Sequence, residues 1–174
     1  MKVIFQIHFV AAFLALLPWA QLMAQPIARP ITATHCAAHE TVYFQCATAS
    51  KKVINLCGVE KQTLQYRFGP PGKIELAYPA NAASGWAQLQ YAHYQRYQTS
   101  QTEVSFSNNA AQYTVFKRTE FSRVTAGVQV STTAAGDKLL QCRGKVITKL
   151  EALEALPCDP DNALNLGACK PSNK

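Results

Sequence analysis

The stretch from Trp86 to Gln101 holds most of the side chains in this sequence that are suited to recognising another molecule. It reads WAQLQYAHYQRYQTSQ, in which aromatic rings, a histidine and an arginine stand among glutamines and no carboxylate occurs. Tyrosine, tryptophan and arginine are the usual anchors of recognition surfaces, because they bury a large area and keep a hydrogen-bonding tip. These residue types therefore predict binding rather than bond cleavage.

As a β-strand, this stretch would point its rings to both sides of the sheet. Side chains alternate along a strand, so Tyr91 and Tyr97 share one face whereas Trp86 and Tyr94 share the other. One face then presents rings to solvent, unless sheet and helix cover the strand on both sides. With two basic residues of the preceding hairpin, the predicted binding residues are Arg67, Lys73, Trp86, Tyr91, His93, Tyr94, Arg96 and Tyr97.

The nearest approach to a metal site is a pair of histidines four residues apart, His35 and His39. They flank Cys36 and precede Glu40, but the order is not the His-Glu-x-x-His of zinc proteases. The run Asp159-Pro160-Asp161-Asn162 lacks the further oxygen ligand and the glycine of an EF-hand loop. We expect exposed loop histidines, no metal and no cofactor.

No catalytic nucleophile is indicated either. The dipeptide Ser84-Gly85 lacks the Gly-x-Ser-x-Gly turn that exposes a serine nucleophile. A Cys–His enzyme needs a free thiol, and the even number of cysteines argues against one. Carboxylate pairs for glycoside cleavage converge only in space, so the sequence leaves them open. We expect a protein that is not an enzyme.

The first 24 residues have the pattern of a secretory signal peptide. Lys2 precedes the apolar run VIFQIHFVAAFLALL, which ends at Pro18 and is followed by small residues. An uncleaved anchor is the alternative, but the run is too short and too interrupted to span a bilayer. We expect removal of residues 1–24, a flexible leader at 25–34, and a periplasmic or secreted protein without a membrane span.

The chain is basic, with 17 Lys and Arg against 10 Asp and Glu and a formal charge of +7. The charge is dispersed, since the densest basic clusters are the dipeptides Lys51-Lys52 and Lys117-Arg118. Nucleic-acid-binding domains instead gather their basic residues on one face, so we do not expect a nucleic-acid partner. The sign of the charge favours an acidic protein or an acidic envelope glycan.

All six cysteines lie in the part of the chain expected to be exported. An even number in an oxidising compartment indicates up to three disulfides, and closely spaced Cys-x-x-Cys pairs for a metal are absent from the sequence. Fifteen pairings are possible, and the sequence alone does not choose among them. The pairing that we expect is Cys36 with Cys57, Cys46 with Cys142, and Cys158 with Cys169.

Short runs with a period of two predict a mainly β fold. About nine strands joined by short turns indicate an antiparallel barrel or sandwich, formed by a single domain at 35–174. The expected strands are 41–46, 52–57, 63–68, 72–78, 86–98, 102–107, 112–118, 124–130 and 138–142.

Near the end of the chain the period changes to three. Ile147, Leu150, Leu153 and Leu156 recur at this spacing, and Pro157 follows them. Together with a Thr–Glu spacing typical of a capping box, this pattern predicts one short amphipathic α-helix at 147–156. A loop closed by its own two cysteines, 158–169, completes the domain.

With CAAHETVYFQC, KKVINLCG, LQYRFGPPGKIELAYP and LPCDPDNAL in view, the chain resembles a group of small exported bacterial proteins of unassigned function. More weakly, it resembles the periplasmic inhibitors of c-type lysozyme, which are small disulfide-bonded β-barrels. The shared features are size, export, the early strand Phe44-Gln45-Cys46 and a late strand ending in Cys142. The inhibitory Ser-Gly-x-x-Tyr loop is not matched, because Gln88 stands in place of the tyrosine, and a basic protein would be repelled by a cationic lysozyme.

The sequence therefore predicts a non-catalytic periplasmic binding protein for a protein or an envelope glycan. The first alternative is an inhibitor or immunity-type protein directed against a peptidoglycan-degrading or toxic enzyme. The second is a hydrolase, which would need a pocket with converging carboxylates or histidines.

Overall fold

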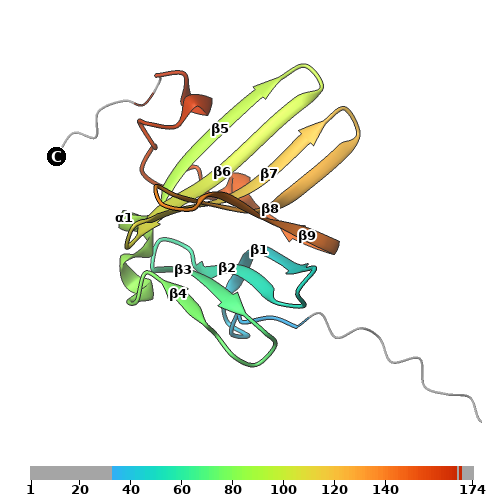
Figure 1. Cartoon of the computed structure of the whole chain (residues 1–174). Coiled ribbons are helices and arrows are strands. Elements are labelled where there is room, and N and C mark those ends of the chain that lie inside the picture. The colour runs from blue at the N-terminus through green and yellow to red at the C-terminus, as the bar shows by residue number, and fades with distance from the viewer. Residues whose placement is uncertain (1–32, 168, 170–174) are drawn as a thin grey trace, which may run out of the picture. The chain divides into compact units, whose positions relative to one another are not determined.

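The computed structural model describes residues 33–167 and 169 (Figure 1). The expected signal peptide and all but the last two residues of the expected leader lie outside this part of the chain. Within it, no helix is long and apolar enough to cross a bilayer.

Nine strands form one antiparallel sheet, which confirms the predicted fold class. The order across the sheet is β4-β3-β2-β1-β9-β8-β7-β6-β5. Strands that are consecutive in the chain are therefore neighbours, except β4 and β5, which form the two edges, and the last strand pairs with the first. The strands are β1 (Thr41–Thr48), β2 (Val53–Val59), β3 (Thr63–Gly69), β4 (Leu76–Tyr78), β5 (Gln90–Arg96), β6 (Thr99–Asn108), β7 (Ala111–Glu120), β8 (Arg123–Thr132) and β9 (Gly136–Thr148).

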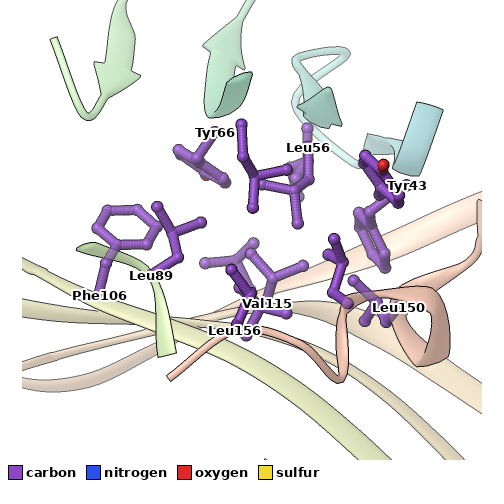
Figure 2. Close-up of a cluster of buried hydrophobic side chains, with 14 of the residues drawn as sticks. Tyr43, Leu56, Tyr66, Leu89, Phe106, Val115, Leu150 and Leu156 are labelled. Carbon is purple, nitrogen blue, oxygen red and sulfur yellow. The ribbon is translucent and has the colours of Figure 1, made fainter. Parts of the chain in front are cut away.

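The sheet curls until its two arms, β1–β4 and β5–β9, face each other across one apolar core (Figures 1 and 2). Most strands contribute alternate residues to this core, as the period of two predicts. Leu56 and Tyr66 come from one arm, while Phe106 and Val115 come from the other. The rings of Tyr66 and Phe106 meet across the interior, with centroids 5.2 Å apart. The result is a curled, barrel-like sheet with β4 and β5 as its edges.

The C-terminal tail covers the outer edge of β5. The backbone N–H of Tyr91 donates to the carbonyl of Pro157 at 2.8 Å, and the N–H of Asp159 donates to the carbonyl of Tyr91 at 3.1 Å. The Cys158–Cys169 disulfide closes the tail just beyond this contact. An exposed strand edge is a template for unwanted pairing, so the tail protects β5.

The three disulfides join the cysteines as predicted. Cys36–Cys57 fastens the N-terminal segment to β2, and Cys46–Cys142 links β1 to β9. Cross-links of this kind stabilise a fold mainly by restricting the unfolded chain.

The expected C-terminal α-helix at 147–156 differs from the observed structure. Ile147 belongs to β9, where it pairs with Gln45, and only Leu150–Leu153 form a helical segment, η2, of the 3-10 type. A 3-10 helix has three residues per turn, so the spacing of the buried leucines fits it better than the 3.6-residue α-helix. The α-helical prediction for this segment was therefore wrong, although its leucines are buried as expected.

The expected strand 86–98 was also too long. The β4–β5 connection contains the 3-10 helix η1 (Ala82–Ser84) and the single-turn helix α1 (Gly85–Gln88), so Trp86 lies in a helix. Gly85 packs directly on the backbone of β3, because a Cβ at this position would lie 1.8 Å from the carbonyl oxygen of Leu64. This close approach holds the connection against the sheet.

Candidate functional site

The eight predicted binding residues do not form one surface. Trp86 is part of the scaffold: its indole N–H donates to the carbonyl of Thr63 at 3.1 Å, and its ring packs edge-on against Tyr43 at 6.4 Å. A tryptophan whose polar atom and ring are both engaged inside the fold is poorly placed to bind a partner.

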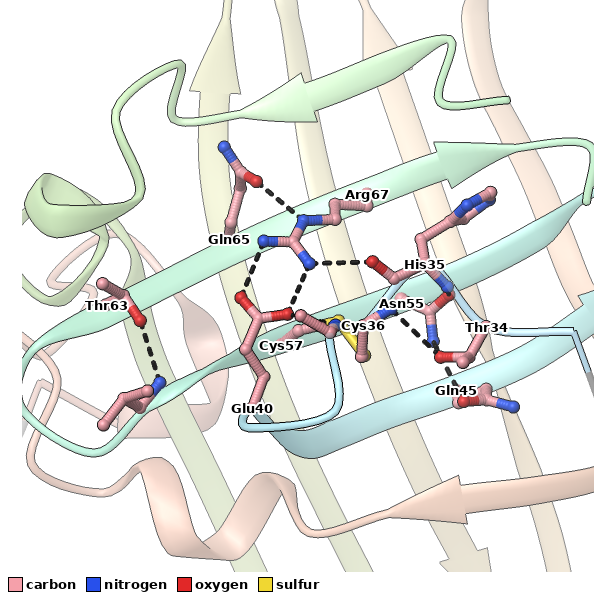
Figure 3. The surroundings of a disulfide bond; sticks show 12 residues. Thr34, His35, Cys36, Glu40, Gln45, Asn55, Cys57, Thr63, Gln65 and Arg67 are labelled. Carbon is pink, nitrogen blue, oxygen red and sulfur yellow. Dashed lines mark hydrogen bonds and ion pairs between the residues drawn. A yellow bond between two sulfur atoms is a disulfide. The ribbon is translucent and has the colours of Figure 1, made fainter. Parts of the chain in front are cut away.

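Arg67 is also engaged within the fold (Figure 3). Its guanidinium donates to both carboxylate oxygens of Glu40 at 2.6 and 2.8 Å, to the carbonyl of His35 at 2.8 Å and to Gln65 at 2.7 Å. Both charged side chains are largely buried, at 11% and 6% exposed. This ion pair, beside Cys36–Cys57, holds the segment before β1 over the outer face of β2 and β3.

The charge of Glu40 is favoured by these contacts. Burial on its own would raise the pKa of this carboxyl, but the hydrogen bonds from Arg67 and from the N–H of Ala37, with the positive charge of Arg67, hold it below its usual value. The carboxylate is therefore ionised and paired at neutral pH.

Tyr91 and His93 lie on the face of β5 that turns toward η2. Their rings stack at 6.3 Å, and the His93 ring is 3.0 Å from the hydroxyl of Thr102, which in turn lies 3.4 Å from Glu151. Burial, with the negative charges of Glu151 and Glu154, raises the pKa of Tyr91 to about 12. Tyr91 therefore links β5 to the C-terminal segment, whereas His93 contacts Thr102 of β6.

Tyr94 and Lys73 occupy different parts of the surface. Tyr94 lies in β5 opposite Gln101 and is half-buried, whereas Lys73 is exposed in the β3–β4 turn of the other arm. Of the predicted set, the remaining residues are Arg96 and Tyr97, and these two lie together at the end of the β5–β6 hairpin.

The ends of the β5–β6 and β7–β8 hairpins lie side by side (Figure 1). The backbone N–H of Phe121, in the second turn, donates to the carbonyl of Gln98, in the first, at 2.7 Å. This bond joins the two turns that carry the exposed rings, since Tyr97 is 87% and Phe121 75% exposed. We call the group the tip cluster; its members are Arg96, Tyr97, Phe121, Arg123 and Val124.

Phe121 adopts a backbone conformation that phenylalanine disfavours. Its φ is +53° at the first central position of a two-residue turn, where hairpins with positive φ usually carry Gly, Asn or Asp. Folding gains little from a ring that is mostly in water, and the backbone costs about 1 kcal/mol or more. The same conformation occurs in other turns of this fold, at Lys51, Lys61, Gln98 and Asn109, so it does not by itself mark Phe121 as a binding residue.

The tip cluster is also positively charged. Arg96 and Arg123 are both exposed and take part in none of the ion pairs within the described chain, and Glu120 is the acidic residue between them in the ladder. Arg118, two residues before Glu120 on β7, donates only to the neutral Gln101, at 2.7 Å. Exposed arginines beside aromatic rings are typical of binding surfaces.

Sequence analysis missed Phe121, Arg123 and Val124. The expected strands 112–118 and 124–130 leave a turn between them, but the segment Glu120-Phe121-Ser122-Arg123 contains no Gly, Pro or Asn, so these residues were not singled out as an exposed hairpin end. A usable signal is the alternation of Val124, Ala126 and Val128, since counting back along it shows that the strand must begin just after Phe121.

The other candidate sites have structural roles. Asp159 is buried and accepts hydrogen bonds from the Ser105 hydroxyl at 2.7 Å and the Asp161 N–H at 3.2 Å. His35 contacts the carbonyl of Gly69 and His39 is exposed. Among residues 33–167 and 169, no three His, Cys, Asp or Glu side chains are grouped as metal ligands.

The Ser84-Gly85 dipeptide does not form a projecting loop. Ser84 donates to the carbonyl of Asn81 at 2.8 Å, and Gly85 is buried against β3. The resemblance to lysozyme inhibitors therefore has no counterpart of their inhibitory loop at this position.

Comparison with models of known protein families, with curated proteins and with solved structures found no match to the chain. The argument for function consequently depends on the residues and their geometry.

Proposed function

We propose that this is a non-catalytic binding protein of the bacterial cell envelope, which holds an acidic protein or envelope glycan with its tip cluster. The observation that carries the proposal is the exposure of two aromatic rings, Tyr97 and Phe121, on adjoining hairpin ends. Aromatic side chains offer a large contact area with few rotatable bonds, so they lose little conformational freedom on binding, which favours affinity.

The charge of the tip cluster supports an acidic partner. Arg96 and Arg123 flank the two rings, and no ion pair within the described residues neutralises them. Electrostatic complementarity of this kind accelerates association and selects partners of opposite sign. Three disulfides support an oxidising compartment, as expected for an exported protein.

A second candidate is an inhibitor of an envelope or toxic enzyme, and the shape of the site favours it. The two turns that carry Tyr97 and Phe121 lie at the ends of long hairpins that project from the rest of the sheet (Figure 1). Projecting turns with aromatic anchors fit a concave partner, such as an active-site cleft. The positive charge points to an acidic enzyme rather than to a cationic lysozyme.

The test uses the purified domain and a variant carrying Tyr97→Ala and Phe121→Ala. Both are immobilised and exposed to envelope extract, with separate samples treated with protease or depleted of glycans. We expect the wild type to retain one partner that the variant loses, while the melting temperature is not lowered, because both side chains are exposed.

The matched control is Leu139→Ala, which removes another exposed apolar side chain, 56% accessible, on β9. It should keep the partner. Equal retention by all three proteins would refute the tip cluster as the binding site. Recovery of one enzyme at equal stoichiometry, with loss of its activity, would select the inhibitor function.

A further inference from the structure

A cleft of about 650 Å³ opens between the two arms of the sheet, next to the β6–β7 turn. The tip cluster lies at the other end of β6 and β7, so the cleft is a separate site and does not depend on the proposed function. Its size falls in the range of small-molecule pockets, and its walls are mostly apolar, as in such pockets. The apolar and aromatic lining consists of Tyr66, Phe68, Leu76, Tyr113, Val130 and Leu140.

The aromatic lining continues a stack of three rings. Tyr78 stacks on Phe106 at 4.4 Å and 10°, and Phe106 stacks on Tyr113 at 5.0 Å and 3°. Tyr113 ends this stack and lines the cleft. Parallel rings at this spacing favour a further planar ring beside them.

Two phenol rings, those of Tyr66 and Tyr113, line the cleft. Their ring centroids are 6.2 Å apart. The hydroxyl on each ring gives the mostly apolar lining a group that can donate or accept a hydrogen bond.

The mouth of the cleft carries an excess positive charge. Lys52 is paired with Glu75 at 2.5 Å and lies over the ring of Phe68, whereas Lys138 has no acidic partner among the ion pairs of the described chain. Among the lining residues, the carboxylate of Glu75 balances only one of the two ammonium groups, so the other can pair with an anion.

We propose that this cleft binds a small planar aromatic molecule that carries an anionic group. Its ring would extend the stack at Tyr113, its polar substituents would meet the two phenols, and its anionic group would pair with Lys138. An aliphatic acid of the same size fits less well, because a saturated chain offers no ring to stack on Tyr113.

The test is calorimetric titration of the wild-type protein with three compounds of similar size: 2-naphthoate, the uncharged 2-naphthalenemethanol, and the aliphatic decanoate. We expect naphthoate to bind with a dissociation constant of about 100 µM or tighter. The other two should bind at least about fivefold more weakly, one for lack of charge and one for lack of a ring.

Two charge reversals locate the anion. Lys138→Glu should weaken naphthoate at least about fivefold and change naphthalenemethanol less than about twofold. Lys145→Glu is the control, because Lys145 is an exposed residue of the same strand that does not line the cleft. Equal effects of the two substitutions on the affinity for naphthoate would refute the binding of its anionic group at Lys138.

A direct contact completes the test and needs no variant. Nuclear Overhauser effects between naphthoate and the ring of Tyr113 are expected in the wild-type protein. Contacts at Tyr97 or Phe121 instead, tighter binding of decanoate, or no binding of any of the three compounds would each refute the proposal.

Discussion

Replacement of Arg67 by methionine should lower the stability of the protein strongly. It should not weaken binding at the tip cluster, because Arg67 lies in another part of the fold. Methionine keeps much of the apolar stem, but the Glu40 carboxylate, 6% exposed, loses both of its guanidinium hydrogen bonds. The donor that remains is the N–H of Ala37 at 2.7 Å. Loss of one partner of a buried pair costs about 3–5 kcal/mol, because it leaves an uncompensated charge.

A loss of this size is large against the usual total stability of about 5–15 kcal/mol. At about 3 °C per kcal/mol for a domain of this size, the melting temperature should fall by about 9–15 °C. The double variant Arg67→Met with Glu40→Gln should recover part of the loss, since it removes the orphaned charge. The difference in the free energy of unfolding between the single and double variants measures the cost of leaving that charge unpaired.

The effect should depend on pH in a defined direction. The pKa of Glu40 is lowered in the folded protein, so the pair contributes fully above the unfolded value near 4.5 and is lost as the pH falls through the folded pKa. In acid the wild type therefore loses the pair, while the variant is relieved of its unpaired charge. The difference in the free energy of unfolding between the two proteins must therefore become smaller in acid.

Urea unfolding at about pH 7 and about pH 3.5 measures both effects. Arg96→Met is the matched control, because it removes an exposed arginine with no ion pair among the described residues, and it should change the stability by less than about 0.5 kcal/mol. A loss below about 1 kcal/mol for Arg67→Met, or the same loss at both pH values, would refute the structural role assigned to this ion pair.

Three further outcomes are expected. Gly85→Ala should lower the free energy of unfolding by about 2 kcal/mol or more, because its Cβ would lie 1.8 Å from a backbone oxygen of β3; thermal denaturation measures this, and an unchanged melting temperature would contradict the close packing. Burial and two nearby glutamates raise the pKa of Tyr91 from 10.0 to about 12, so the neutral phenol contributes stability that is lost as the pH rises through this range. In unfolding curves, Tyr91→Phe should therefore lose less stability than the wild type between these two pH values. The same dependence of stability on pH in both proteins would count against this role of Tyr91. Phe121→Gly should be more stable than Phe121→Ala by about 1 kcal/mol, because both lack the ring and only alanine keeps the strain at φ +53°; equal melting temperatures would show that the turn is unstrained.

The strands and the disulfides could be predicted because their signals are local. Period-two runs such as Val124, Ala126 and Val128 determine which side chains face a core, and short turns make consecutive strands neighbours. The break in this order falls at the β4–β5 connection, so β1 and β9 are neighbours in the middle of the sheet, and Cys46 and Cys142 lie close enough to be joined. The strand order and the Cys46–Cys142 pairing therefore support each other.

The C-terminal segment shows where local signals fail. Its Thr148–Glu151 spacing resembles a capping box, yet Thr148 pairs with Phe44 in the sheet, and its hydroxyl is a buried side-chain atom without a hydrogen bond. Pairing with β1 extends β9 as far as Thr148 and leaves only Leu150–Leu153 to coil. The sequence of this segment alone could not reveal the strand pairing that competes with the helix, because the partner strand lies about a hundred residues earlier in the chain.

The candidate site could not be predicted from residue type, because the same types serve opposite roles in this fold. Arg67 and Arg96 are chemically identical, but one is bound by four hydrogen bonds and the other is exposed on a hairpin end. Trp86 and Tyr97 differ in the same way, since the tryptophan is anchored to β3 and the tyrosine has almost its whole ring in water. What separates a scaffold residue from a binding residue is whether the fold satisfies its polar atoms and covers its ring. For the tip cluster the fold does neither, and this exposure is the reason that the proposed function assigns the partner to these residues.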